Sequence, residues 1–129
     1  MCGNRRALIS SGSPYEPVIG FSRAIVAGHH VTVAGTAPIM PGGADPAADA
    51  YGQARRCLEI ILAALAEAGV GAANVVRTRI LLVRRDDLED EGRAHGEVLG
   101  DIRPASTVVV VQGFIDPRWL VEMEADAVL

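Results

Sequence analysis

Aromatic residues are scarce in this chain: they make up 4% of it, although 50% of the residues are hydrophobic. A hydrophobic core must therefore be built mainly from Val, Leu, Ile and Ala side chains. Long apolar runs are also missing, since none approaches the ~18 residues of a membrane-spanning helix, and no signal peptide opens the chain. We therefore expect a cytoplasmic protein without a membrane partner, folded as a single domain over residues 1–129.

Cysteine and basic charge are scarce as well. Cys2 lies near the N-terminus and Cys57 within a helical pattern, a placement that predicts neither a metal site nor a disulfide framework. Cys57 is most simply a core residue. The formal net charge of −4 argues against nucleic acid as a partner. The chain also lacks a Walker loop and a G-x-G-x-x-G motif, so nothing indicates a bound nucleotide.

What the chain does contain is an ordered set of strands and helices. The hydrophobic patterns predict six strands and two helices, separated by Pro- and Gly-rich loops at 11–17 and 36–46. The expected strands are 7–10, 21–27, 30–35, 74–83, 107–111 and 119–128, and the expected helices are 50–68 and 87–99. This order predicts an α+β fold in which both helices cover one face of the sheet. The other face, part apolar and part charged, is a candidate oligomer interface.

Several local expectations follow from these patterns. Either Asp45 or Asp49 caps the first helix and Gly69 ends it, while Gln53 falls outside its apolar stripe. Asp86 or Asp87 caps the second helix. The run at 107–111, a threonine followed by four valines, suits a strand that is buried on both faces.

The last strand carries a row of acids. Glu122, Glu124 and Asp126 alternate with apolar residues, so one face of this strand is acidic and the other must pack. The acids are candidate catalytic carboxylates. The simpler interpretation is that Arg77 and Arg79, which share a face of the strand at 74–83, pair with two of them across the sheet.

The remaining polar candidates give weaker signals. His29 and His30 fall at a hairpin turn, where solvated histidines are common, and His95 is expected at the surface or in an interface. Ser106 precedes the valine run, but no histidine or aspartate partner and no G-x-S-x-G elbow supports it as a nucleophile.

Four stretches, taken together in order and spacing, resemble the RidA (YjgF) family, also known as L-PSP endoribonuclease. They are VTVAGTAP at 31–38, QARRCLEIILAALAEAG at 53–69, VVRTRILLV at 75–83 and RPASTVVVVQGFIDPRWLVEMEADAV at 103–128. The resemblance extends from about residue 6 to the end. It implies a chorismate-mutase-like α+β fold with a six-stranded mixed sheet, assembled as a homotrimer with clefts between neighbouring subunits.

The resemblance also implies a chemistry. The best-known members hydrolyse enamines and imines to 2-oxo acids and ammonia without a metal or organic cofactor. A guanidinium clamps the substrate carboxylate, and a carboxylate helps to place the attacking water. The family's glutamate on the last strand is matched by Glu122, the expected catalytic residue. Its cleft tyrosine falls on Phe21 and its cleft serine on Ala34, while the following glycine is kept as Gly35.

The family's arginine is the main departure. It follows the Pro-Ala that opens the fifth strand, where this chain has Ser106; Val108 is a further expected ligand contact on the same strand. Losing a charge-assisted contact in such a cleft costs on the order of 2–5 kcal/mol, so we predict little or no activity on 2-aminoacrylate. Arg103, Arg79 or a neighbour's arginine is the alternative source of the guanidinium.

Three functions stay open at this point. The first is a diverged hydrolase, in which the pocket of Phe21, Ala34 and Ser106 accepts a less acidic or more apolar substrate than the usual 2-imino or 2-oxo acid. The second is a non-catalytic protein that binds or senses a small molecule. The third is a ribonuclease or translation inhibitor, which the acidic charge disfavours.

Overall fold

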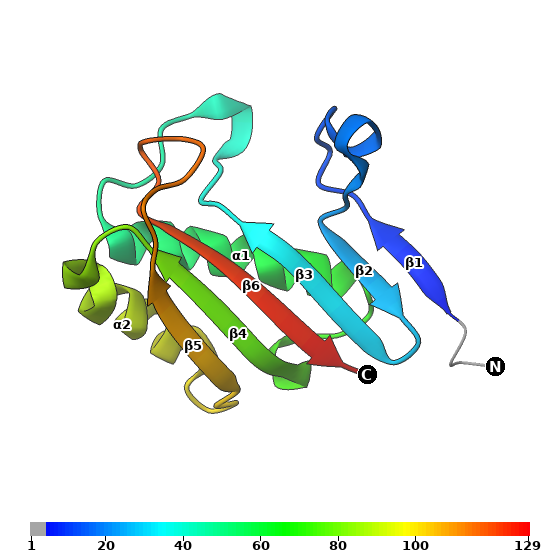
Figure 1. The fold of residues 1–129 in the computed structure, drawn as a ribbon. Coiled ribbons are helices and arrows are strands. Elements are labelled where there is room, and N and C mark those ends of the chain that lie inside the picture. Colours follow the sequence, from blue (N-terminus) through cyan, green and yellow to red (C-terminus); the bar gives the residue numbers. More distant parts are fainter. Residues whose placement is uncertain (1–4) are drawn as a thin grey trace.

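Six strands form one mixed sheet in the computed structural model, which describes residues 5–129 (Figure 1). The strands are β1 Arg6–Ile9, β2 Ala24–Ala27, β3 His30–Thr36, β4 Val75–Leu82, β5 Ala105–Val110 and β6 Val121–Val128. Their order across the sheet is β1-β2-β3-β6-β4-β5, and every neighbouring pair is antiparallel except β4 and β5. The α+β class and the six-stranded mixed sheet are confirmed. Cys2 lies outside the described residues.

Two helices, α1 Ala50–Glu67 and α2 Leu88–Leu99, lie on the same face of the sheet (Figure 1). Of the two cap candidates for α1, Asp49 is correct: its Oδ1 accepts a hydrogen bond from the backbone N–H of Gly52 at 2.9 Å. Gly69 follows α1 with a φ of 86°, a conformation that favours glycine. Within residues 5–129, no helix is both long and apolar enough to cross a membrane.

The core lies between the helices and the sheet. The apolar residues of β6 (Val121, Met123, Ala125 and Ala127) are all at most 2% exposed, and they face the apolar stripe of α1. The alternation expected for the last strand is therefore confirmed. Cys57 is buried in the same core, and burial raises the pKa of its thiol, so a core role is confirmed as well.

β5 differs from its prediction. All six of its residues are exposed in this chain, because β5 is the edge strand and pairs only with β4. The expectation of a strand buried on both faces is therefore wrong for the single chain. The residues Val108, Val109 and Val110 are 39%, 40% and 57% exposed. Such a run of exposed valines on a sheet edge is a surface that a further chain could cover.

Three smaller expectations also fail. Gln53, which was expected outside the apolar stripe of α1, is 1% exposed. The expected strand at 21–27 begins only at Ala24, because a π-helical turn, Glu16–Gly20, precedes it and occupies part of the predicted loop. Asp87 stands at the start of α2, but its carboxylate accepts a hydrogen bond from Arg84 Nη2 at 3.0 Å instead of one from the helix backbone.

Candidate functional site

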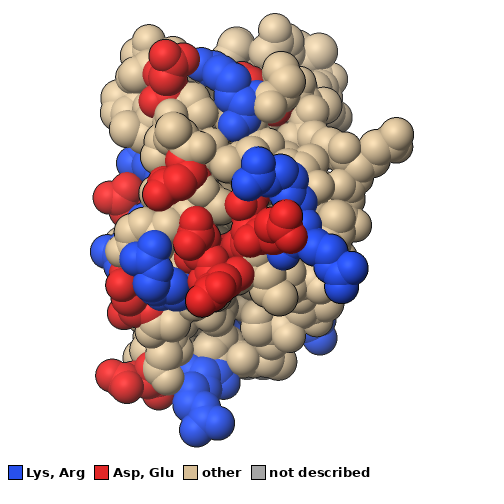
Figure 2. Space-filling view, turned by 90° about the vertical axis from the view of Figure 1, so that its left-hand side faces the viewer, with Lys and Arg blue, Asp and Glu red and all other residues tan. Residues whose placement is uncertain are grey.

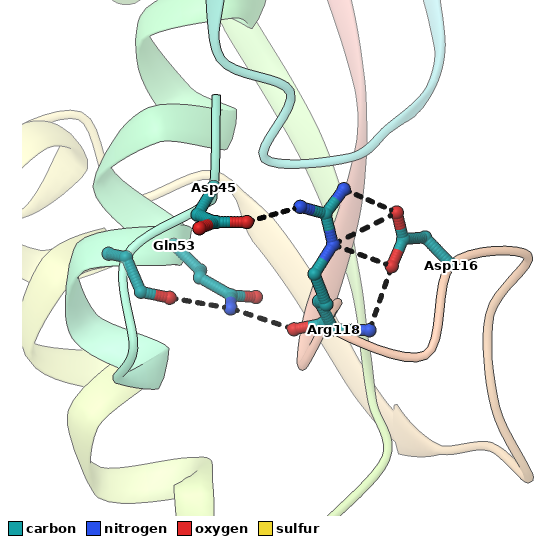
Figure 3. Close-up of polar contacts among 5 residues, drawn as sticks. Asp45, Gln53, Asp116 and Arg118 are labelled. Atoms are coloured by element: carbon teal, nitrogen blue, oxygen red, sulfur yellow. Dashed lines mark hydrogen bonds and ion pairs between the residues drawn. The ribbon is translucent and has the colours of Figure 1, made fainter. Parts of the chain in front are cut away.

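Ion pairs of Arg118 fix the position of the segment before β6. Its guanidinium makes ion pairs with Asp116 at 2.8 Å and with Asp45 at 2.6 Å (Figure 3). Asp45 belongs to the loop that leads into α1, so this cluster joins two loops that are far apart in sequence. Both loops lie side by side at the upper end of the sheet in Figure 1.

Gln53 completes this support from inside the fold. Its side-chain Nε2 donates to the backbone carbonyls of Ala47 and Arg118, at 2.8 and 3.0 Å, and its Oε1 accepts from the N–H of Leu120 at 2.7 Å. A buried amide that satisfies three backbone groups holds its neighbours in one arrangement. The start of β6 is therefore fixed just before Glu122.

Glu122 lies on the bare face of the sheet and is half-buried. Burial raises the pKa of its carboxyl group; nearby Glu124 raises it further, while Arg23 opposes the shift. Its Oε1 lies 3.4 Å from the point that a Cβ atom on residue 35 would occupy, so Gly35 leaves room for the carboxylate. The register of β3 shifts between Val33 and Thr36, which places this glycine beside β6.

Arg23 is the residue of this corner that the sequence did not single out. Its Nη1 donates to the carbonyl of Gly35 at 3.1 Å and to the hydroxyl of Thr36 at 3.0 Å. Burial lowers the pKa of the guanidinium, and Glu122 is among the acids that raise it again. The sequence feature that could have indicated Arg23 is its position as a single arginine directly before the apolar run of β2.

Phe21 and Ala34 lie together, as expected for two walls of one pocket. Both line a hollow of about 670 Å³ on the bare face of β1, β2 and β3. Phe21 also borders a second hollow of about 650 Å³, whose lining includes Arg23. We name the region around Phe21, Arg23, Ala34, Gly35 and Glu122 the Glu122 corner.

The other two acids of β6 are engaged in pairs. Glu124 makes an ion pair with Arg79 at 3.3 Å, as the pairing interpretation predicted. Asp126 lies opposite Arg77 in the register, but its Oδ1 pairs instead with His30 Nε2 at 3.3 Å and accepts from the hydroxyl of Thr32 at 3.0 Å. Among residues 5–129, Glu122 is therefore the acid of the row without a hydrogen bond or ion pair.

Ser106 lies on the edge strand β5 and has a partner that the sequence did not reveal. Its Oγ is 2.8 Å from the hydroxyl oxygen of Thr78, which is itself 2.8 Å from Nε2 of His95. His95 of α2 is therefore linked to Ser106 indirectly, through Thr78. We name this group the Ser106 edge.

The predicted site residues thus fall into two groups that one chain does not bring together. Phe21, Ala34, Gly35 and Glu122 lie on β3, β6 and the approach to β2, whereas Ser106 and Val108 lie on β5. β4 separates the groups, since Leu81 pairs with Glu122 on one side and with Val109 on the other. Arg103, exposed and with a φ of 54°, precedes β5. No group of three possible metal ligands is found among the described residues.

The family model for endoribonuclease L-PSP matches residues 12–129. The chain belongs to the RidA/YjgF family. It is 42% identical over 119 residues to the uncharacterized protein SCO2049 of Streptomyces coelicolor, covering 92% of this chain and 89% of that protein. The resemblance expected from the four sequence stretches is therefore confirmed.

Two solved structures have the same fold. Rv2704 of Mycobacterium tuberculosis, a member of the YjgF/YER057c/UK114 family, is 39% identical, with a TM-score of 0.87 over 97% of this chain and all of that one. TdcF of E. coli, solved with bound serine, shares the fold at 21% identity, with a TM-score of 0.80 over 95% of this chain and 93% of that one.

Proposed function

We propose that this RidA/YjgF protein binds a small metabolite in clefts between the subunits of a homotrimer and hydrolyses a carbon–nitrogen double bond in it. No metal or organic cofactor takes part, and the place of action is the cytoplasm. The observation that carries the proposal is the state of Glu122. Its carboxylate is half-buried and has no ion pair among the described residues, while the neighbouring acids are engaged.

The separation of the two groups of site residues supports an assembly of several chains. Phe21 and Glu122 lie at one part of the sheet and Ser106 at the far edge, so a cleft that uses both needs a second chain. The bare sheet face and the exposed valines of β5 offer the surface for such contacts. TdcF, the relative solved with bound serine, supports a polar small molecule as the class of ligand.

In this proposal Glu122 acts as the general base. Water attacks the carbon of the C=N bond, and the Glu122 carboxylate takes a proton from that water. A carboxyl group whose pKa is raised by burial is a stronger base at neutral pH than an exposed one. The sequence contains no lysine, so an imine exchange with a lysine side chain is not available, and water is the attacking group.

The proposed substrate is less acidic than 2-aminoacrylate. Arg79 is engaged with Glu124, and Ser106 offers a hydroxyl where the family arginine would bring a charge. Losing that contact reduces transition-state stabilisation for an acidic substrate by roughly thirtyfold to several thousandfold. The apolar lining around Phe21, Leu8 and Ile25 favours an imine with an apolar side chain.

The test is a hydrolysis assay in which a second enzyme generates the imine in the reaction mixture. A flavin-dependent amine oxidase generates imines without a carboxylate from apolar primary amines such as isoamylamine and phenethylamine, and serine dehydratase generates 2-aminoacrylate. We expect faster release of the aldehyde from the apolar imines and little change in the release of pyruvate from 2-aminoacrylate. Glu122→Gln should abolish the acceleration, whereas Glu124→Gln, the matched change two residues along the same strand face, should retain it.

A non-catalytic binding protein is the second candidate, and the bound serine of TdcF is the observation that favours it. No acceleration with any imine, combined with equal ligand affinity in wild type and Glu122→Gln, would establish this alternative. A ribonuclease has less support. On the side of the molecule that carries α2 and β5, the arginines stand among acidic side chains and do not form a continuous basic surface over the described residues (Figure 2).

A further inference from the structure

Three side chains from three elements form a hydrogen-bonded chain at the Ser106 edge. Ser106 of β5 lies beside Thr78 of β4 because the two strands run parallel with these residues in register. The oxygen atoms of their hydroxyl groups are 2.8 Å apart, and the Thr78 oxygen is also 2.8 Å from Nε2 of His95 on α2. Both distances are those of good hydrogen bonds.

The hydrogen-bonded chain of Ser106, Thr78 and His95 runs from the solvent into the protein. Ser106 is exposed, Thr78 is 2% exposed and His95 is half-buried. Burial lowers the pKa of His95, so its imidazole is neutral at pH 7 and one of its nitrogens is free to accept a proton. The polar end of this arrangement that a ligand can reach is therefore the Ser106 hydroxyl.

The tautomer of His95 sets the direction in which the three side chains donate their hydrogen bonds. When Nε2 carries no proton, Thr78 donates to it and Ser106 donates to Thr78, which leaves the Ser106 oxygen free to accept from outside. When Nε2 carries the proton, His95 donates to Thr78, Thr78 donates to Ser106, and the Ser106 hydroxyl points its proton outward. Each arrangement ends in a usable group on Ser106.

We propose that Ser106, Thr78 and His95 form a proton relay, in which Ser106 touches the ligand and His95 receives the proton. Ser106 is then a catalytic residue, and Thr78 and His95 act through it. This inference rests on the proposed imine hydrolysis and assigns a second proton-transfer group to the same cleft, besides Glu122.

The relay serves the second half of that reaction. After water has added to the protonated imine, Glu122 passes the proton that it took from the water to the nitrogen, so the tetrahedral adduct carries a hydroxyl group and a protonated amine and Glu122 is a carboxylate again. As its C=O bond forms, its hydroxyl proton passes to Ser106 Oγ, the Ser106 proton passes to Thr78, and the Thr78 proton passes to His95 Nε2. The C–N bond breaks, and the amine leaves with that electron pair. The imidazolium then releases its proton to solvent.

The surroundings suit a neutral histidine. Glu91 lies one turn before His95 on α2 and is 2% exposed, with its Oε1 buried and unpaired among the described residues. Burial raises the pKa of Glu91 to about 7. Farther along α2, Glu97 is held by Arg55 of α1 at 3.2 Å. On the helix face, Ile80 and Val108 follow Thr78 and Ser106 along β4 and β5, so these strands bring apolar side chains there.

The experiment compares Thr78→Val, which interrupts the chain with a side chain of the same shape, with His95→Gln and Ser106→Ala. His30→Gln is the matched control, since His30 is an exposed histidine paired with an acid. The relay predicts a fall in kcat of roughly 10–100-fold for each of the three variants, with KM little changed. The relay also predicts that kcat of the wild type falls at acid pH with a midpoint below the ordinary histidine pKa. This fall should be absent in His95→Gln.

An NMR titration of the imidazole nitrogens gives a reading that does not depend on activity. The relay predicts that the His95 signals shift in Thr78→Val and in Ser106→Ala but not in His30→Gln. If the wild type hydrolyses the imines and Thr78→Val and His95→Gln keep its kcat, the relay is overturned and the proposed function stands. If the wild type hydrolyses no imine, the proposed function fails; His95 signals that ignore Thr78→Val overturn the hydrogen-bonded chain itself.

Discussion

The Glu122 corner and the Ser106 edge belong to the same sheet but hold their polar groups in opposite ways. Glu122 has no ion pair among the described residues, and its position is set by backbone: a glycine opposite it and a fixed strand start before it. Ser106 is positioned by side chains, through two hydrogen bonds that end on another element. A group held by backbone tolerates changes around it, whereas a group held by a side-chain network loses its role when one member changes.

The largest expected effect is the loss of catalysis when Glu122, in the Glu122 corner, is changed. Glu122→Gln keeps the shape but removes the base, so we expect kcat for imine hydrolysis to fall by about 10²–10⁴-fold. Glu124→Gln should stay close to wild type, because Glu124 is engaged with Arg79. Steady-state kinetics with oxidase-generated imines measures both. Equal losses in the two variants would show that charge on the strand matters rather than this one base.

The support of the corner should matter for folding. Gln53→Ala leaves the Leu120 N–H and the carbonyls of Ala47 and Arg118 without their buried partner. We expect the free energy of unfolding to fall by about 2–4 kcal/mol, as measured by urea denaturation. Arg55→Ala, a change of an exposed residue on the same helix, should have a much smaller effect. Equal effects would mean that Gln53 does not fix the start of β6.

Helix α2, which contributes His95 to the Ser106 edge, contains a buried acid, Glu91, whose effect on stability depends on pH. Burial raises the pKa of Glu91 to about 7 in the folded state, above its value in the unfolded chain. The stability linked to Glu91 is therefore fully present below pH 4.5 and is lost as the pH rises through about 7. We expect this loss to amount to about 2 kcal/mol, and Glu91→Gln should remove it. Exposed Glu89→Gln should leave the pH dependence of unfolding unchanged.

The smallest effect concerns Arg23. Because Arg23 opposes the burial that raises the pKa of Glu122, Arg23→Met should raise that pKa further. The base is active as the carboxylate, so the acid limb of the kcat profile that belongs to Glu122 should move to higher pH. A shift to lower pH, or none, would show that Arg23 does not act on Glu122.

Much of the fold could be predicted from local sequence. The alternation of β6 and the apolar stripe of α1 follow directly from side-chain periodicity, and Asp49 and Gly69 mark the helix ends. The exposure of β5 could not be predicted, because a run of valines looks the same in a central strand and in an edge strand. Which of the two it becomes depends on strand order, a tertiary property.

The same limit applies to the site. Glu122 could be predicted as a candidate site residue because its strand and its place in the family pattern are both visible in the chain. The link from Ser106 to His95 was missed because it depends on the parallel register of β4 and β5 and on how α2 packs over them. The burial of Gln53 was missed for a similar reason, since two of its partners, Arg118 and Leu120, lie far along the chain.

Mixing two impaired variants tests most directly whether the Glu122 corner of one chain works with the Ser106 edge of another. Glu122→Gln and Ser106→Ala chains are unfolded together, refolded as mixed assemblies, and assayed for imine hydrolysis. If each cleft takes Glu122 from one chain and Ser106 from its neighbour, about a quarter of the clefts in random mixtures are intact, and activity returns to a corresponding fraction of wild type. If the mixture is no more active than the separate variants, the two groups do not meet across a subunit boundary, and the account is contradicted.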